Sequence, residues 1–160
     1  MGVRSVRAYA DTSIFGGVFD DEFAEPSRAF FDQVRNGVYR LVLSAVVRDE
    51  LDGAPACVRE LLAEIGDVSE TVDVSDEAVL LQQAYLDAGI VGPSWATDAL
   101  HVAVATVSDC RLIVSWNFKH IVHFQKIPLY NGVNMAHGYA AIAIHSPQEV
   151  IVDADEGKDL

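Results

Sequence analysis

Three side chains in this sequence have types and positions that could bind a divalent metal ion. They are the carboxylates of Asp11, Glu50 and Asp98, and the amide of Asn117 is a further candidate for the same site. Carboxylate oxygens are hard ligands that suit Mg²⁺ or Mn²⁺, and a bound cation removes the repulsion between neighbouring carboxylates. The residue types therefore predict one shared site for a hard divalent cation.

Asp11 and Asn117 each come just after a segment that is expected to form a β-strand. Asp11 directly follows the apolar run 6–10, and Asn117 comes two residues after the run 112–115. In open parallel sheets, ligands bind beyond the carboxyl ends of the strands, so polar residues at these positions are site candidates. The alternative for Asp11 is a purely local role, as a helix N-cap or in an Asx turn.

Glu50 lies in the segment 44–52, where helical periodicity places it on the same face as Val46, Val47 and Leu51. A glutamate on an apolar face is unfavourable unless it is neutralised, paired or bound to a metal. This placement makes Glu50 a second candidate ligand. The alternative is a short helix that begins later and leaves Glu50 exposed.

Asp98 lies on a helix predicted at Trp95–Val107, which is apolar on nearly all sides and is therefore expected to be buried. Asp98 and His101 are its only titratable residues and lie one turn apart near the helix N-terminus, where the helix dipole favours a carboxylate. Asp98 is the third candidate ligand. The alternatives are a partly buried capping acid for Asp98 and a core histidine bonded to backbone for His101.

The elements that must position these residues alternate along the chain between short β-branched runs and longer helical stretches. This alternation predicts an α/β fold with a central parallel sheet. The expected strands are Val6–Ala10, Leu41–Ser44, Thr71–Val74 and Leu112–Ser115, with a weaker one at Ile127–Tyr130. The expected helices are Glu25–Val34, Pro55–Ile65, Glu77–Ala88 and Trp95–Val107.

The C-terminal part carries weaker signals. Asn131–Ile144 is rich in small apolar residues and is expected to be helical, and Glu149–Val152 is expected to add an edge strand. Residues 153–160 are predicted to form an acidic tail. The chain length of 160 residues fits one domain, expected at residues 1–152, because domains usually have about 100 to 200 residues.

Composition excludes several classes of function. Lysine and arginine number 11 against 24 aspartates and glutamates, so the formal net charge is −13, which argues against unaided binding to nucleic-acid phosphates or anionic membranes. No apolar run approaches the ~18 residues that span a bilayer, and the first ten residues lack a signal-peptide core. Neither of the two cysteines lies in a CxxC pair. We therefore expect a cytoplasmic protein without membrane contact.

Taken together, four short motifs resemble those of the PIN-domain nucleases, among them the VapC-like toxins of bacterial toxin–antitoxin pairs. Their order and spacing cover roughly residues 6 to 125. The matching segments are 9–13 (YADTS), 44–51 (SAVVRDEL), 97–103 (TDALHVA) and 113–121 (IVSWNFKHI).

The resemblance implies a three-layer α/β/α domain in which Asp11, Glu50 and Asp98 form the acidic metal-binding set for Mg²⁺ or Mn²⁺. It implies metal-assisted hydrolysis of RNA phosphodiester bonds, so that the chain would be an endoribonuclease. Asn117 occupies the fourth position, where many relatives carry Asp; because Asn has no charge, this departure argues against a second tightly bound ion. The hydroxyl residues near the site would hold waters or phosphate oxygens, and they are Thr12, Ser13 and Ser115.

The resemblance also implies partners. A toxin of this type would bind a small antitoxin protein whose segment fills the acidic groove. Relatives commonly pair, so we expect a homodimer, with the regions Glu25–Val34 and Tyr85–Trp95 as candidate contact surfaces.

One dense basic cluster follows Asn117, and it consists of Lys119, His120, His123 and Lys126. It could grip an RNA strand in an otherwise acidic chain. The interleaved aromatics Trp116, Phe118 and Phe124 could stack on bases or belong to the core. Zinc binding by the two histidines is an alternative, although no third ligand lies nearby in the sequence.

Two other functions fit parts of the pattern. A PIN-like binding or regulatory module would keep the fold without turnover. An aspartyl phosphatase of the haloacid-dehalogenase kind would also place its nucleophile at Asp11, but that chemistry needs a second acid two residues later, where this chain has Ser13.

Overall fold

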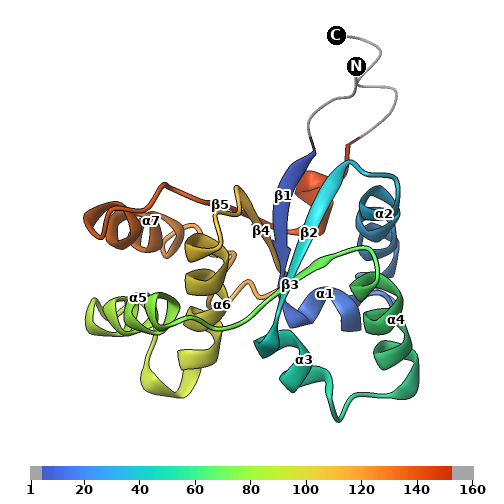
Figure 1. Cartoon of the computed structure of the whole chain (residues 1–160), viewed down its shortest axis with the longest axis horizontal. Coiled ribbons are helices and arrows are strands. Elements are labelled where there is room, and N and C mark those ends of the chain that lie inside the picture. The colour runs from blue at the N-terminus through green and yellow to red at the C-terminus, as the bar shows by residue number, and fades with distance from the viewer. Residues whose placement is uncertain (1–4, 153–160) are drawn as a thin grey trace, which may run out of the picture.

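The computed structural model describes residues 5–152 and contains a five-stranded, wholly parallel sheet in the order β3-β2-β1-β4-β5. The sheet, shown in Figure 1, confirms the predicted α/β class with a central parallel sheet. β1 is the central strand, so whatever follows it lies in the middle of the carboxyl edge. The strands are β1 (Val6–Ala10), β2 (Tyr39–Ser44), β3 (Glu70–Val72), β4 (Leu112–Val114) and β5 (Ala143–His145).

Helices cover both faces of the sheet, which gives the three-layer α/β/α arrangement that the resemblance implies (Figure 1). One layer holds α1 (Thr12–Gly17), α2 (Ala24–Arg35), α3 (Ala45–Leu51) and α4 (Ala56–Gly66). The other holds α5 (Asp76–Asp87), α6 (Ala96–Val107) and α7 (Ile127–Ala136), and a short helix α8 (Pro147–Val150) packs against α2.

The central strands are buried on both faces, as is usual for a parallel sheet between two helix layers. Ala8, Tyr9 and Ala10 of β1 have no exposed surface, and neither do Ile113 and Val114 of β4. Continuous apolar runs therefore read clearly as strands in the sequence. Because the strand is buried in this way, a polar side chain at the end of β1 is surrounded by protein on several sides.

Local capping explains where two helices of the site region begin. The Ser44 hydroxyl accepts a hydrogen bond from the backbone N–H of Val47 at the start of α3, and the Ser75 hydroxyl accepts one from Ala78 at the start of α5. Gly89 follows α5 with a φ of +73°, in the left-handed region that glycine enters without a steric penalty. The start and end of α5 were thus readable from the sequence.

The sequence-based expectations for the C-terminal part were wrong in three places. Residues 127–130 begin helix α7 instead of forming a strand, because Pro128 suits a first helical turn and Tyr130 packs into the core. The segment expected to be helical, Asn131–Ile144, is helical only as far as Ala136. Its last two residues belong to edge strand β5, because pairing with β4 satisfies their backbone groups.

Residues 149–152, expected to be an edge strand, instead include the end of α8. A Ser146 and Glu149 capping box with Pro147 at the first helical position starts this helix. That signal was present in the sequence. The predicted acidic tail, 153–160, lies outside the described residues. Within residues 5–152, no helix is long and apolar enough to cross a membrane.

A close contact at Gly17 tests how tightly α1 is packed behind the site. A Cβ atom at this position would lie 2.6 Å from the Ser27 hydroxyl oxygen and 2.8 Å from Nε1 of Trp116, two atoms that share a buried hydrogen bond of 2.8 Å. We expect Gly17→Ala to lower the free energy of unfolding by about 1 to 3 kcal/mol, because the added methyl group overpacks this contact. Urea denaturation followed by circular dichroism measures the change.

Gly16→Ala is the matched control, since a Cβ at this neighbouring helical position meets nothing within 4 Å. It should leave stability unchanged or raise it by roughly 0.5 to 1 kcal/mol, because alanine favours helix over glycine. Equal denaturation midpoints for the two variants would contradict the packing at Gly17.

Candidate functional site

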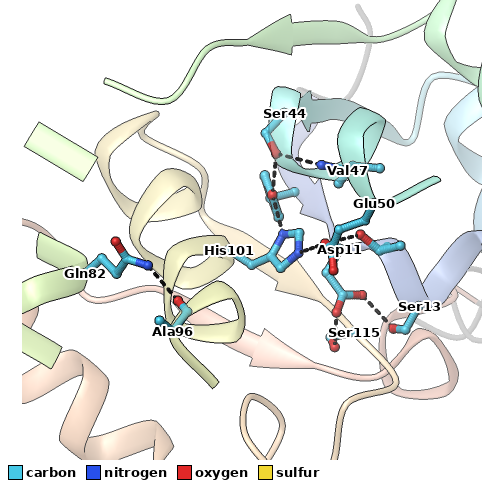
Figure 2. Close-up of polar contacts among 11 residues, drawn as sticks. Asp11, Ser13, Ser44, Val47, Glu50, Gln82, Ala96, His101 and Ser115 are labelled. Carbon is cyan, nitrogen blue, oxygen red and sulfur yellow. Dashed lines mark hydrogen bonds and ion pairs between the residues drawn. The ribbon is translucent and has the colours of Figure 1, made fainter. Parts of the chain in front are cut away.

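The site is built around the carboxylate of Asp11, at the carboxyl end of the central strand β1. This side chain is 4% exposed. Its Oδ1 accepts a hydrogen bond of 2.6 Å from the Ser13 hydroxyl, and its Oδ2 accepts one of 2.8 Å from the Ser115 hydroxyl, as Figure 2 shows. Both carboxylate oxygens are therefore held by hydroxyl donors, one from the first turn of α1 and one from the loop after β4.

The two serine hydroxyls are themselves fixed in direction. The Ser13 oxygen accepts the backbone N–H of Trp116 at 2.8 Å, and the Ser115 oxygen accepts the backbone N–H of Asn117 at 2.9 Å. Each hydroxyl has one proton, and here it is donated to Asp11. The loop after β4 thus packs against the first turn of α1 around a single carboxylate.

A local capping role does not account for Asp11. The residue occupies the N-cap position of α1, yet its side chain makes no capping hydrogen bond to the backbone of that helix. N-cap side chains normally accept a backbone N–H in the first turn. The Asp11 carboxylate instead accepts hydrogen bonds from two serine hydroxyls. Helix capping therefore does not explain why this carboxylate is buried.

Glu50 of α3 lies on the same side of the site. Its Oε1 accepts a 2.7 Å hydrogen bond from the Thr12 hydroxyl. The same oxygen is hydrogen-bonded to Nε2 of His101 at 2.6 Å (Figure 2). The side chain is 38% exposed. The expectation that Glu50 shares the buried face of Val46 and Val47 is therefore wrong in detail, because the long side chain reaches across to His101 instead of entering the core.

The two carboxylates have opposite electrostatic environments. Burial raises the pKa of Asp11 above its ordinary value, against the lowering effect of the His101 charge and the two serine hydroxyls, and the charge of Glu50 adds to the increase. For Glu50, burial alone acts upward, but the hydrogen bonds from His101 and Thr12 bring its pKa below its ordinary value. A cation placed here would favour the ionised form of both groups.

Asp98 does not join this pair. It is half-buried in the first turn of α6, and within residues 5–152 it makes no hydrogen bond or salt bridge. Its charge acts on His120 and Tyr130. Over the described part of the chain, no three His, Cys, Asp or Glu side chains are close enough to hold a metal ion together. The structure thus brings Asp11 and Glu50 together and leaves Asp98 one helical turn from His101.

Asn117 has a structural partner of its own. Its Oδ1 accepts the backbone N–H of His120 at 2.9 Å, so the amide orders the turn that follows β4. The backbone N–H of Asn117 meanwhile orients Ser115 toward Asp11. Asn117, at the fourth motif position, therefore helps to orient the Ser115 hydroxyl that donates to the Asp11 carboxylate.

The basic cluster predicted to bind RNA splits into buried and accessible parts. His120 is 7% exposed and stacks on Trp95, with ring centroids 4.4 Å apart, and its ring nitrogens have no hydrogen-bond partner within the described residues. The Lys119 ammonium lies 4.9 Å from the Trp95 ring centroid. Lys126 donates to the backbone carbonyl of Ile90. Lys119 and Trp95 therefore form the accessible part nearest the start of α6.

The aromatic residues of this loop divide in the same way. Trp116 is buried and stacks on Phe23 with centroids 4.2 Å apart, so it belongs to the core. Phe118 is about half exposed, and Phe124 is 80% exposed beside His123. Only the latter two offer faces on which a base could stack.

Sequence analysis did not identify Tyr9 as part of the site, and it did not identify the hydrogen-bond partners of His101. His101 is buried as expected, but both its ring nitrogens bond side chains and not backbone. Nε2 bonds Glu50, and Nδ1 lies 2.7 Å from the Tyr9 hydroxyl. That hydroxyl also lies 2.8 Å from the Ser44 hydroxyl. Nothing in the sequence marks Tyr9, since an aromatic residue within a strand is usually part of the core.

Comparisons with known proteins support the fold. No protein-family description matches the sequence, and no curated protein matches it. Among solved structures, the chain is similar to a chain of the VapBC2 complex from Rickettsia felis bound to a DNA fragment from its promoter. The TM-score is 0.58 at 14% identity, over 88% of this chain and 98% of that one.

It is also similar to a chain of DNA-bound VapBC from Salmonella typhimurium. Here the TM-score is 0.57 at 18% identity, over 89% of this chain and 98% of that one. Identities this low establish the fold alone. The chain therefore has the fold found in VapBC complexes, as expected of a VapC-like PIN domain.

Proposed function

We propose that this protein is a metal-dependent endoribonuclease of the VapC-like type, which hydrolyses RNA phosphodiester bonds with Mg²⁺ or Mn²⁺. The observation that carries the proposal is the buried carboxylate of Asp11 beside Glu50 at the carboxyl edge of the central strands. Within residues 5–152, Asp11 forms no salt bridge that would offset its burial. A buried carboxylate of this kind fits a cation ligand.

The donor set suits a hydrated hard cation. Asp11 and Glu50 provide carboxylate oxygens, and both hydrogen bonds to Glu50 reach Oε1, so that Oε2 accepts none from the described residues. Mg²⁺ keeps several waters and is commonly held by one or two carboxylates plus substrate phosphate. Two carboxylates are therefore enough for such an ion, and we propose that Asp98 of α6, which is not grouped with them among the described residues, acts through water.

A bound ion would polarise the phosphate and lower the pKa of a water molecule that attacks it. The chain's own residues have separate tasks. Ser13 and Ser115 hold Asp11 in one orientation. Glu50, kept ionised by His101 and Thr12, is placed to orient a water molecule or accept its proton. We assign Lys119 to contacts with substrate phosphates.

The partner proposal is based on the structural neighbours and on charge. Both neighbours are VapBC assemblies bound to DNA, and we extend their type of partnership to this chain by proposing an antitoxin protein as its partner. With a net charge of −13, the chain would attract a basic segment of such a partner toward the acidic site. We also propose a homodimer.

A binding module without turnover is the second candidate. It is favoured by the observation that, over residues 5–152, no group of three ligands surrounds the site. Metal uptake and RNA cleavage distinguish it from the nuclease.

We expect the wild-type protein to cleave a mixed pool of structured and single-stranded RNA in the presence of Mn²⁺ or Mg²⁺. Asp11→Asn should reduce the rate by about 100-fold or more, because a metal ligand contributes several kcal/mol of transition-state stabilisation. EDTA should abolish cleavage. Gel-based cleavage assays measure both effects.

Asp52→Asn provides the control, since it changes the net charge equally at an exposed position at the end of α3. It should cleave like the wild type. If the wild type leaves RNA and single-stranded DNA intact and calorimetry shows no uptake of Mn²⁺, the nuclease proposal fails and the binding module replaces it.

The buried charge of Asp11 should also cost stability. Because burial raises the pKa of Asp11 in the folded state, its contribution is most favourable at low pH and is lost as the pH rises through that pKa. Without metal at pH 7, Asp11→Asn should therefore raise the melting temperature by about 2 to 4 °C, the equivalent of about 1 kcal/mol. Differential scanning calorimetry across pH 4 to 8 measures this.

The difference between Asp11→Asn and the wild type should shrink as the pH falls, because the wild-type carboxyl becomes protonated. Added Mg²⁺ should stabilise the wild type and not the variant. A melting temperature that drops in Asp11→Asn at every pH would show that the carboxylate is a structural requirement of the fold.

A further inference from the structure

We propose that His101, itself held by Tyr9, is a positioning residue that fixes the carboxylate of Glu50 for the metal or water at the site. The inference extends the proposed function and rests on it, because it assigns a task within the same site. It concerns two residues that lie within the quoted motifs but to which the resemblance assigns no role.

A continuous chain of side-chain hydrogen bonds runs from the core to Glu50. The Ser44 hydroxyl at the end of β2 bonds the Tyr9 hydroxyl of β1, and that hydroxyl bonds Nδ1 of His101 on α6. Nε2 of His101 then bonds Oε1 of Glu50 on α3 at 2.6 Å. Four elements from both helix layers and the sheet thus converge on one carboxylate.

The direction of the last hydrogen bond follows from the acceptor. A carboxylate oxygen can only accept a hydrogen bond, and Oε1 of Glu50 already accepts one from the Thr12 hydroxyl. Nε2 of His101 must therefore carry the proton that is donated to Glu50. The contact of Tyr9 with Nδ1 holds the ring in the orientation that aims Nε2 at Glu50.

The buried residues of the hydrogen-bond chain, Tyr9 and His101, restrict the side chain of Glu50. Glu50 is 38% exposed, and a glutamate at such a position can sample many rotamers. His101 is only 2% exposed and Tyr9 has no exposed surface, so their positions are set by the packed core. Glu50 therefore takes its orientation from the interior of the protein.

The hydrogen bonds to Glu50 leave one carboxylate oxygen, Oε2, available to bind a metal or a water molecule. Both Thr12 and His101 bond Oε1, while Oε2 accepts no hydrogen bond from the described residues. A fixed Oε1 restricts where Oε2 can lie. The carboxylate is thus presented in one orientation to a metal or to a water molecule.

The test combines three variants, Tyr9→Phe, His101→Gln and His101→Ala, with a matched control. Tyr9→Phe removes only the hydroxyl that orients His101, and His101→Gln replaces the ring with an amide that can still donate to Glu50. Tyr85→Phe is the control, because it removes a different buried tyrosine hydroxyl that bonds Asn134 between α5 and α7. Thermal melting first establishes that each variant is folded.

We expect Tyr9→Phe to weaken Mn²⁺ binding, measured by calorimetry, and to lower kcat for RNA cleavage by about 10-fold or more. KM for RNA should stay unchanged, because neither residue contacts the substrate. His101→Gln should retain more of both properties than His101→Ala does, since the amide rescues the hydrogen bond. Tyr85→Phe should match the wild type.

Nitrogen NMR of ¹⁵N-labelled histidine gives a readout that needs no activity. The His101 Nε2 should be protonated, and Glu50→Gln should shift its resonance while Asp52→Asn leaves it in place. If the wild type cleaves RNA but Tyr9→Phe and His101→Ala cleave like Tyr85→Phe, the positioning inference is wrong and the proposed function stands.

If the wild type neither binds Mn²⁺ nor cleaves RNA, the proposed function fails, and the positioning role of His101 fails with it. If the His101 Nε2 resonance does not shift in Glu50→Gln, the inference is wrong whatever the activity. A shift of this resonance in Glu50→Gln, together with weakened Mn²⁺ binding in Tyr9→Phe, supports it.

Discussion

The burial of one negative charge, the carboxylate of Asp11, is the constraint on which the site depends. A carboxylate that is almost fully removed from water is unfavourable unless donors surround it. Here the donors are two serine hydroxyls, each locked by a backbone N–H from the loop after β4. The first turn of α1 and the loop after β4 must therefore lie close together, and the parallel pairing of β1 with β4 brings them to the same edge of the sheet.

The second carboxylate is controlled differently. Glu50 lies partly in solvent, yet it is tied through His101 and Tyr9 to the centre of the sheet. One acid is thus buried and electrostatically disfavoured, while the other is accessible and held ionised. Two neighbouring carboxylates with such different environments suit the proposed metal-assisted chemistry, in which one would anchor an ion while the other would orient water.

Much of the fold followed from local sequence. The strands at 6–10, 41–44 and 112–115 are apolar because both their faces are buried, and this pattern is strong enough to read without a structure. The C-terminal segment was misjudged because its signals are weak and conflicting. Its short strand β5 forms only because β4 offers an unpaired edge, and that edge belongs to residues about 30 positions earlier.

The sequence by itself determined the α/β class, the position of Asp11 at a strand end and the candidacy of Glu50 as a paired acid, because periodicity and local polarity are properties of short segments. Only the tertiary structure decided which side chains meet. It brought His101 to Glu50 across 51 residues and Tyr9 to His101 across 92 residues, and it left Asp98 outside these contacts. Such contacts depend on how helices cross the sheet, which no local pattern encodes.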